Sequence, residues 1–485
     1  MTGIKPIKSD LEFGILDKAQ IAEIRAATLT ILEEVGIHFP SDKALNIFSD
    51  HGAEVDKDTQ IVRIPTDLVL EAMSHAPRSY TLNGRTAGTE LVLDGSLSYF
   101  STDGSGTETI DFTTGLQRQS TKADVAMMAK VSDYLSSISF YWPIVSAQDC
   151  GPSSPLHELE ASFINTSKHI QSVTIIGEEL SQYALSMGEI IAGSADKLRK
   201  NPPLSSLVCT IAPLGQDKEG IEGAMLYARA GVPVGFMAMP NLGSTAPATM
   251  AGALAVGNSE VVSAMVLMQL VNPGAPVFHS ILGSVMDPRS GSYITGISEK
   301  YLCNAAAVQI AHDWNVPSLA GAYSVDCQTP DSWQLGRDSV YTSLFTPLLG
   351  AELVEGLGLL KAATLLIPEQ ILYDDEIYHT HRKLAEGIRT SPDQIALDVI
   401  KSVGPGGHYL GQKHTRSKIR EIWLPTLTHP APVMGDQQPI EIKERARERM
   451  QKILTDHQPE PLAVEIEAEL SKVITVAERN SIHIV

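Results

Sequence analysis

Residues 231–280 decide the fold class; they read GVPVGFMAMPNLGSTAPATMAGALAVGNSEVVSAMVLMQLVNPGAPVFHS. The nearly unbroken apolar run at 232–239 is typical of a strand that is covered on both faces. Small and turn-forming residues follow it, and Thr245 is expected to cap a helix that ends near Leu270. The next apolar run, 275–280, must then be a strand parallel to the first, so the stretch is one βαβ unit.

The same alternation continues through most of the chain. Apolar runs that predict strands are separated by segments of helical period at 156–167, 179–193, 217–230, 247–270, 298–313 and 333–348. The predicted strands lie at 138–146, 172–177, 206–213, 232–239, 275–280, 316–324 and 352–358, with an eighth supplied by 98–104. This pattern favours an α/β fold of the TIM (β/α)₈ barrel type, and an open doubly wound sheet is the second interpretation.

Segments outside the alternation predict two extensions. Residues 1–120 contain two capped helices and then short strands with turns, which indicates a helical and β extension on the N-terminal side of the barrel. Residues 121–375 form the predicted barrel core. Residues 376–485 read as a C-terminal helical extension whose last two helices, near 441–456 and 462–479, are strongly charged. That charge is interpreted as a solvated face, with a docking surface for a partner as the alternative.

Composition narrows the function classes. The 485 residues carry a formal charge of −20, which argues against nucleic acid or an anionic membrane as a partner. Four scattered cysteines indicate neither a disulfide framework nor a thiolate zinc site. The N-terminus lacks a signal-peptide pattern, and Asn258 and Glu260 interrupt the long apolar helix, which is therefore expected in the core. We expect a cytoplasmic protein, and a homo-oligomer.

Polar residues gather where the predicted strands end, at Asn241, Ser244, Thr245, His279 and Ser280. Ligands bind at this end of parallel α/β folds. A lyase or aldolase would require a catalytic lysine or metal-binding carboxylates at the strand ends, and the sequence shows neither. No dinucleotide-binding glycine motif follows an early strand. His408 and His414 lack a third converging ligand, so no metal site is predicted.

Four blocks, in order along the chain, carry a resemblance to a known family. They are TGLQRQSTKADVAMMAKVSDYL, NLGSTAPATMAGALAVGNSEVVSAMVLMQLVNPGAPVFHS, SVMDPRSGSYITGISEK at 284–300 and GGHYLGQKHTRSKIREIWLPTL at 406–427. The sequence resembles the trimethylamine methyltransferase family. The resemblance implies a TIM barrel that transfers a methyl group from a methylated amine to the cobalt of a separate corrinoid protein. It also implies that the corrinoid (cobalamin) travels on that partner, with no cofactor bound tightly by this chain.

The sequence departs from the founding branch of that family at one position. Pyrrolysine there precedes a Pro-Asp pair, whereas the matching stretch here, SVDCQTPDSW, has Thr329. Pyrrolysine is thought to form an adduct with a free amine, which needs a lone pair that a quaternary amine lacks. The resemblance therefore points to the quaternary-amine branch, with glycine betaine as the leading substrate. Proline betaine, carnitine and γ-butyrobetaine remain alternatives, and so does a betaine-binding protein without transfer activity.

A quaternary ammonium is bound best by aromatic faces, each contributing about 0.5–2 kcal/mol. Two or three of the following are expected to touch substrate: Tyr99, Phe100, Tyr141, Trp142, Tyr323, Trp333 and Phe345. The substrate carboxylate is best held by a guanidinium or by histidine. Arg289 is the leading anchor, with an ion pair to Asp287 as the structural alternative.

The remaining candidates come from the same strand ends and loops. His279 and Asn241 are the candidates for contact with substrate, although a histidine such as His279 is more often a wall residue of the barrel than a ligand. Asp326 and Asp331 flank Thr329 and are expected to face the ammonium, with turn capping as the structural alternative.

Overall fold

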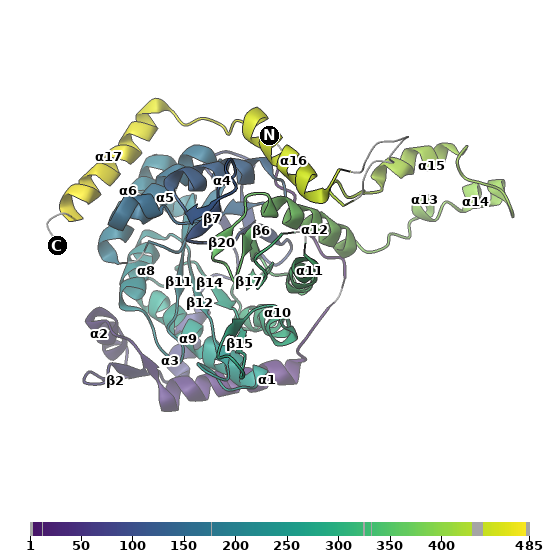
Figure 1. Ribbon diagram of the computed structural model, residues 1–485. Helices are drawn as coiled ribbons and strands as arrows, with labels where there is room; N and C mark the ends of the chain where they lie inside the picture. The colour runs from purple at the N-terminus through teal and green to yellow at the C-terminus, as the bar shows by residue number, and fades with distance from the viewer. Residues whose placement is uncertain are drawn as a thin grey trace.

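A computed structural model describes residues 3–11, 13–175, 177–323, 325–330, 332–428 and 440–481. Its centre is a barrel of eight parallel strands in the order β14-β12-β11-β10-β9-β6-β18-β17 (Figure 1). A parallel bridge between His279 and Ser318 joins the last strand to the first. The predicted TIM barrel is confirmed, and the open sheet is wrong. The strands are β6 (Tyr99–Thr102), β9 (Phe140–Tyr141), β10 (His169–Ser172), β11 (Leu204–Cys209), β12 (Val234–Ala238), β14 (Val277–Ile281), β17 (Leu319–Gly321) and β18 (Leu353–Leu357).

Helices surround the barrel, and six of them follow the six predicted helical segments within a few residues (Figure 1). Their apolar faces cover the outside of the strands, which explains why the strands read as continuous apolar runs. The surrounding helices are α4 (Lys122–Tyr134), α5 (Ser154–Asn165), α6 (Glu178–Ala192), α8 (Lys218–Ala230), α9 (Met250–Val271), α10 (Ser298–Asp313), α11 (Trp333–Leu348) and α12 (Gln370–Ala385). The short α7 (Ala195–Lys200) and the 3₁₀ turn Gln148–Ser153 lie in connecting loops.

The strand predicted at 172–177 is instead β10, which ends at Ser172. Its polar residues hide the strand in the sequence. In the fold they are buried and satisfied: the His169 ring bonds the Asn83 carbonyl (2.9 Å) and the Ser205 hydroxyl (2.9 Å). A polar residue can therefore occupy a barrel strand when a neighbouring strand supplies its partner.

Helix α9 starts later than predicted, at Met250, with Thr249 as its N-cap. Thr245 instead belongs to a tight turn, where its hydroxyl accepts from the Asn241 N–H (3.0 Å). Length and hydropathy alone would let α9 cross a membrane, but 83% of its apolar window is buried inside the protein. The N-terminal helices α1 (Lys18–Thr30), α2 (Asp42–Asp50) and α3 (Thr66–Ser74) pack on its outer side. Helix α9 is therefore a core helix, which explains why it is apolar on every face.

The N-terminal segment closes the bottom of the barrel. The hairpin of β4 (Tyr80–Leu82) and β5 (Leu91–Leu93) places Leu82, Leu91 and Leu93 against the apolar side chains of the barrel interior. The Tyr80 hydroxyl donates to the carbonyl of Val277, at the start of β14 (3.0 Å). The sheet of β1 (Ile37–His38), β2 (Glu54–Asp56) and β3 (Ile61–Arg63) lies between the N-terminal helices, and a π-helical turn (Ile31–Val35) ends α1.

Two small sheets follow the C-terminal ends of barrel strands and flank the mouth. One contains β7 (Glu108–Ile110) and β8 (Gln117–Gln119), which follow β6, with β19 (Leu359–Leu360) and β20 (Leu365–Leu366), which follow β18. The other contains β13 (Asn241–Leu242), β15 (Ser284–Met286) and β16 (Tyr293–Ile294). Together they place loops from four barrel strands around one opening.

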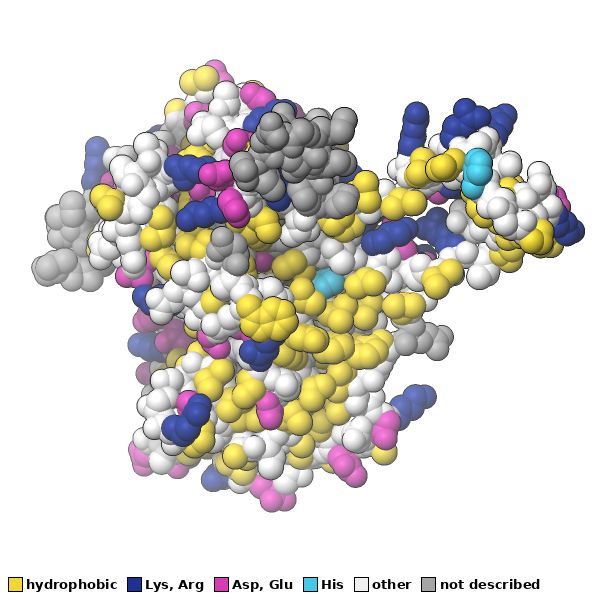
Figure 2. All heavy atoms as spheres, turned by 45° about the vertical axis from the view of Figure 1, so that its right-hand side comes forward, with side chains coloured by type: hydrophobic (Ala, Val, Ile, Leu, Met, Phe, Trp, Pro, Cys, Tyr) yellow, Lys and Arg dark blue, Asp and Glu magenta, His cyan; other side chains and the backbone are white. Residues whose placement is uncertain are grey.

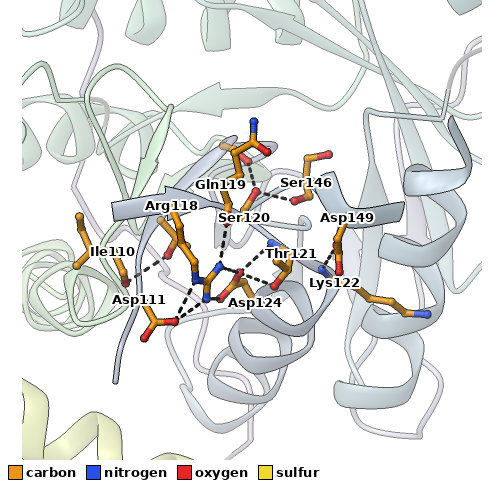
Figure 3. A network of polar contacts seen from close by, with 12 residues as sticks. Ile110, Asp111, Arg118, Gln119, Ser120, Thr121, Lys122, Asp124, Ser146 and Asp149 are labelled. Atoms are coloured by element: carbon orange, nitrogen blue, oxygen red, sulfur yellow. Dashed lines mark hydrogen bonds and ion pairs between the residues drawn. The ribbon is translucent and has the colours of Figure 1, made fainter. Parts of the chain in front are cut away.

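An arginine anchors the first mouth sheet to the barrel (Figure 3). Arg118 on β8 pairs with Asp111 in the β7–β8 turn (2.9 Å) and with Asp124 on α4 (2.7 Å). The Thr114 N–H of the turn and the Arg118 guanidinium hold the pKa of Asp111 well below its usual range. The Ser120 hydroxyl adds a bond to the Ser146 carbonyl (2.6 Å). The sheet is thereby fixed over the side of the mouth where β6 and β18 end.

The C-terminal extension has two different parts. Helices α16 (Ile442–Asp456) and α17 (Val464–Ser481) lie against the body and bury Ala446, Met450, Ile453, Leu470, Ile474 and Ala477. Their charged residues form the opposite, solvated face. Between α12 and α16 the chain leaves the body as a projecting hairpin that contains α13 (Pro392–Ile395), α14 (Leu397–Val403) and α15 (Lys413–Lys418), followed by a 3₁₀ turn (Ile419–Glu421) (Figure 1). One barrel strand, β6, precedes residue 121, and the division at 120 and 375 stays a prediction.

Candidate active site

The barrel interior changes from apolar to polar along its axis. Its lower part is filled by an apolar cluster that includes Tyr99, Phe140, Leu207, Met237, Phe278, Leu319 and Leu353. Inward positions alternate along each strand, so the next inward residues toward the mouth are Gln171, Cys209, Ser280 and Glu355. A buried polar layer therefore lies just beneath the mouth, where barrel enzymes carry their chemistry.

Two carboxyl groups form the centre of this layer. Asp103 directly follows β6, and Glu355 lies on the adjacent strand β18; their side chains are hydrogen-bonded to each other. The residues are only 7% and 3% exposed. Burial raises the pKa of Asp103 to about 6, and burial together with the Asp103 charge raises the pKa of Glu355 well above its usual range. Two carboxyl groups this close hold one proton between them at neutral pH.

A buried lysine completes the cluster. Lys300 lies in the first turn of α10, is 2% exposed, and interacts electrostatically with Glu355 and Asp103. Burial lowers the pKa of Lys300, while the two carboxyl groups oppose that shift. Asn304, one turn further along α10, donates to the Gly321 carbonyl (3.2 Å), which fixes this face of the helix against β17. A Cβ on Gly321 would lie 2.9 Å from the Glu355 carboxyl, so glycine makes room for the cluster.

Several buried polar groups near the mouth have no partner within the part of the chain that the structure describes. They are the Trp142 indole N–H, both polar atoms of the Gln171 amide and the Ser280 hydroxyl. Trp142 follows β9, Gln171 is on β10 and Ser280 is on β14. Leaving such groups unpaired costs about 1–3 kcal/mol each, so a bound ligand that pairs with them is favoured.

The cluster combines acidic and basic groups. One shared proton leaves the Asp103–Glu355 pair with a single negative charge, and that charge favours the protonated form of Lys300. A carboxyl pair attracts a cation and a protonated lysine attracts an anion, so the cluster presents both kinds of charge. The Trp142 ring adds an aromatic face for a cation.

The sequence prediction missed these three residues, of which Asp103 and Glu355 lie at the ends of neighbouring barrel strands. Asp103 and Glu355 are 252 positions apart in the sequence. They meet because β6 and β18 are neighbouring strands. Lys300 comes from a helix rather than a strand. The available signal was the glutamate inside the apolar run ELVEGL, because a charged residue in a buried strand requires a partner.

The predicted aromatic residues divide between two sides of the barrel wall. Trp142 lies in the interior at the mouth, and Tyr99 lies in the interior at the bottom, where its hydroxyl accepts from the Val92 N–H (3.2 Å). The other predicted aromatic side chains point away from the barrel interior and lie outside the candidate site. Phe100 lies edge-on to Tyr323, with 6.3 Å between the ring centroids, and Phe345 stacks on Phe13 at a centroid distance of 5.3 Å. The Tyr141 hydroxyl donates to the Val125 carbonyl on α4 (3.1 Å). Trp333 is exposed at the start of α11.

Arg289 and His279 also lie outside the buried layer. The Arg289 side chain is 86% exposed and pairs with Asp287 (3.0 Å) at the tip of the β15–β16 hairpin, which is the structural alternative stated above. His279 faces outward from β14 and bonds the Asn258 side chain on α9 (2.9 Å). Burial lowers the pKa of His279 to about 3, so it is neutral. The roles of Arg289 and His279 toward a substrate stay predictions.

The loop candidates lie around the mouth. Asp326 accepts from the Thr295 N–H (3.0 Å) and the Gly296 N–H (2.8 Å), so it ties the loop after β17 to the loop before α10. Thr329 is exposed in the same loop, and Asp331 lies outside the described residues. Asn241 starts β13, with its buried side-chain oxygen unpartnered in the described structure. Their roles toward a substrate stay predictions.

Comparisons with known proteins find a matching family model and similar proteins. The sequence model of the family described as Trimethylamine methyltransferase (MTTB) matches residues 3–481. The chain is 33% identical to the trimethylamine methyltransferase MttB of Desulfitobacterium hafniense (strain DSM 10664 / DCB-2), over 95% of this chain and 93% of that protein. It is 32% identical to the glycine betaine methyltransferase of D. hafniense (strain Y51), over 96% of this chain and 97% of that protein. The crystal structure of the Methanosarcina barkeri monomethylamine methyltransferase matches with a TM-score of 0.49 and 12% identity, over 95% of this chain and 91% of that chain.

Proposed function

Because the chain belongs to the trimethylamine methyltransferase family, we propose that it moves a methyl group from a quaternary amine to the Co(I) of a corrinoid protein. Glycine betaine is the substrate that we favour, and dimethylglycine is the product. Two features of the sequence support this choice: the similarity to a glycine betaine methyltransferase, and Thr329 at the position where the founding branch has pyrrolysine.

The observation that carries the proposal is the buried Asp103–Glu355–Lys300 cluster. A betaine is a zwitterion, with a quaternary ammonium that accepts and donates no ordinary hydrogen bond and a carboxylate that accepts several. Lys300 and the unpaired N–H groups of Trp142 and Gln171 suit the carboxylate. The carboxyl pair and the Trp142 ring suit the ammonium, because both attract a cation without needing an N–H. Trimethylamine has no carboxylate and would leave the N–H groups of Trp142 and Gln171 unpaired.

The chemistry asks little of the protein beyond binding and orientation. The Co(I) of the partner supplies a strong nucleophile, and the carbon–nitrogen bond breaks with its electron pair left on a neutral amine. The enzyme holds the substrate so that one methyl group faces the mouth, at roughly 3–3.5 Å from the attacking atom. The buried layer keeps water away from that step, and the charges around the ammonium resist its movement.

Access defines the docking side. The corrinoid cannot pass through the filled interior of an eight-stranded barrel, so it must approach the mouth. Loops 241–246, 284–297 and 325–330 form the rim of that mouth and therefore the proposed contact area. The reducing cytoplasm is the compartment that we expect for Co(I) chemistry.

The deciding experiment offers free Co(I) cobalamin to the purified enzyme with glycine betaine, proline betaine, carnitine, γ-butyrobetaine or trimethylamine. Methylcobalamin is followed by absorbance, and the amine product is identified by mass spectrometry. Fastest transfer from glycine betaine, with dimethylglycine released, supports the proposal. Faster transfer from trimethylamine than from every betaine would contradict the quaternary-amine assignment.

A further inference from the structure

The hairpin between α12 and α16 has no core of its own. From residue 388 to residue 424, which we call the arm, the structure buries no residue, and α13, α14 and α15 bury none. Its two legs are held together by polar contacts: Lys418 pairs with Asp393 (2.8 Å), and the His414 ring bonds the Asp393 carbonyl (2.8 Å). The arm is thus an ordered element that projects from the body (Figure 1).

The arm exposes large apolar side chains in unusual number. They are Ile388, Ile395, Leu397, Ile400, Tyr409, Leu410, Ile419, Ile422 and Leu424, with Ile388 94% and Leu410 79% exposed. Single exposed apolar residues are normal on a soluble protein, but a contiguous group of this size marks an interaction surface. Hydrophobic and basic side chains cover the arm together in Figure 2.

A second exposed apolar surface lies at the base of the arm. Helix α11 packs beside α12, whose end carries the arm, and it exposes Trp333 (87%), Val340 and Tyr341. Leu384, near the end of α12, is also exposed. We call these four residues the α11 face. Figure 2 shows hydrophobic side chains gathered on the body below the arm.

We propose that the arm docks on the α11 face of a second copy of this chain, and that the second arm docks reciprocally on the first copy. A two-fold arrangement covers both apolar surfaces with one interface, because each copy supplies an arm and a face. Charge favours the same partner. The arm has six Lys and Arg residues against three Asp and Glu, in a chain of net charge −20, so the rest of each copy attracts the arm of the other.

The apolar character of both surfaces argues for a permanent partner rather than the corrinoid protein. A corrinoid partner must leave after each methyl transfer, and transient interfaces are more polar than obligate ones. An arm made for it would expose its nine apolar side chains whenever the partner left. A second copy of the chain is always present.

The test compares the assembly of the full-length protein with that of two double variants, by light scattering after gel filtration. L410E/I422E changes the arm, and V92E/L116E makes the same chemical change at exposed residues of β5 and the β7–β8 turn. The wild type and V92E/L116E are expected to be oligomers with an even number of chains. L410E/I422E is expected to dissociate, with a dimer Kd raised about 100-fold or more, because two buried apolar side chains are replaced by charges.

Reciprocal docking has a direct check. L410C and W333C are prepared separately, mixed and oxidised, and a cross-link between the two different chains is expected, since each arm meets the other copy's α11 face. Wild type, in which Cys150 is only partly buried, gives the background. The substituted residues are exposed, so circular dichroism and Tm should remain close to those of the wild type.

Three outcomes would overturn the proposal. In the first, the wild type is a monomer at about 10 μM. In the second, L410E/I422E assembles as the wild type does. In the third, the wild type is a monomer and L410E/I422E loses methyl transfer to the corrinoid protein but not to free cobalamin. The last outcome would assign the arm to that protein. None depends on which amine is the substrate, because assembly is measured without substrate.

Discussion

Gly104 lies directly against the indole of Trp142: a Cβ on Gly104 would fall 1.9 Å from the indole nitrogen. No side chain fits there without moving the ring. Gly104 also donates its N–H to Asp103 (2.8 Å), so the same residue touches two members of the candidate site.

Replacing Gly104 with alanine therefore displaces Trp142 without adding or removing charge. We expect kcat/KM for glycine betaine to fall about 100-fold, since displacements near 1 Å at a reacting centre have effects of that size. G336A is the matched control, because Gly336 lies on exposed α11 with no atom near its Cβ position. Equal activity of the two variants would remove Trp142 from the binding site.

The anchor for the substrate carboxylate is tested at Lys300. K300M keeps the length and burial of the side chain but removes its charge. Glycine betaine binding, measured by calorimetry, is expected to weaken about 10- to 100-fold, the usual effect of losing a charge-assisted hydrogen bond. Choline, which lacks a carboxylate, is expected to lose little.

R289A provides the comparison for that result. The exposed Arg289 side chain already pairs with Asp287, so its removal is expected to change neither affinity. A selective loss of betaine binding in R289A, with K300M unaffected, would instead identify Arg289 as the anchor.

Two adjacent aspartates on α12 predict opposite effects of pH on stability. Burial raises the pKa of Asp374 to about 8, so between about pH 4 and 8 the folded protein keeps a proton that the unfolded chain has released. The contribution of Asp374 to stability is thus full below pH 4 and is lost as pH rises toward 8. D374N removes this dependence, and its Tm relative to wild type should rise from pH 5 to pH 8.

Asp375 serves as the control of opposite sign. His379 (3.4 Å) and Arg449 (2.8 Å) pair with it and outweigh its burial, so its pKa is lowered. Its contribution is present at neutral pH and is lost as the pH falls below the ordinary range for aspartate. D375N should therefore lower Tm at pH 7, with a deficit that shrinks in acid. Parallel Tm-pH curves for the two variants would refute both assignments.

The barrel was predictable because its signal is local and periodic. Strand 232–239 and helix 298–313 follow from apolar runs and their spacing, and the structure places β12 and α10 there. The buried cluster was not predictable in this way. Asp103, Lys300 and Glu355 each look ordinary in their own segment, and only the closure of β6 against β18 brings them together.

The direction of each side chain was the second feature that the sequence alone could not predict. Phe100 and Trp142 both lie at or next to barrel strands, but the twofold alternation of a strand sends one outward to Tyr323 and the other into the interior. A single-residue error in register exchanges the two faces. Aromatic residues could therefore be assigned to strands but not to the substrate.

The rim of the mouth gives the last prediction. Gln328 is exposed in the loop after β17 and makes no side-chain hydrogen bond in the described structure, whereas Ser332 caps α11 through the Leu335 N–H (3.1 Å). Q328W is thus the cleaner way to add bulk without weakening a helix.

If the corrinoid protein docks on this rim, Q328W should slow methyl transfer to that protein at least about 10-fold, because steric overlap removes well-packed contact area. Transfer to free cobalamin should change less than about twofold, since a small acceptor passes the added ring. The measurement is the ratio of the two rates in Q328W against wild type, with L116E on the β7–β8 turn as a second surface change. A ratio equal to that of the wild type would place the docking surface away from the loop at 325–330.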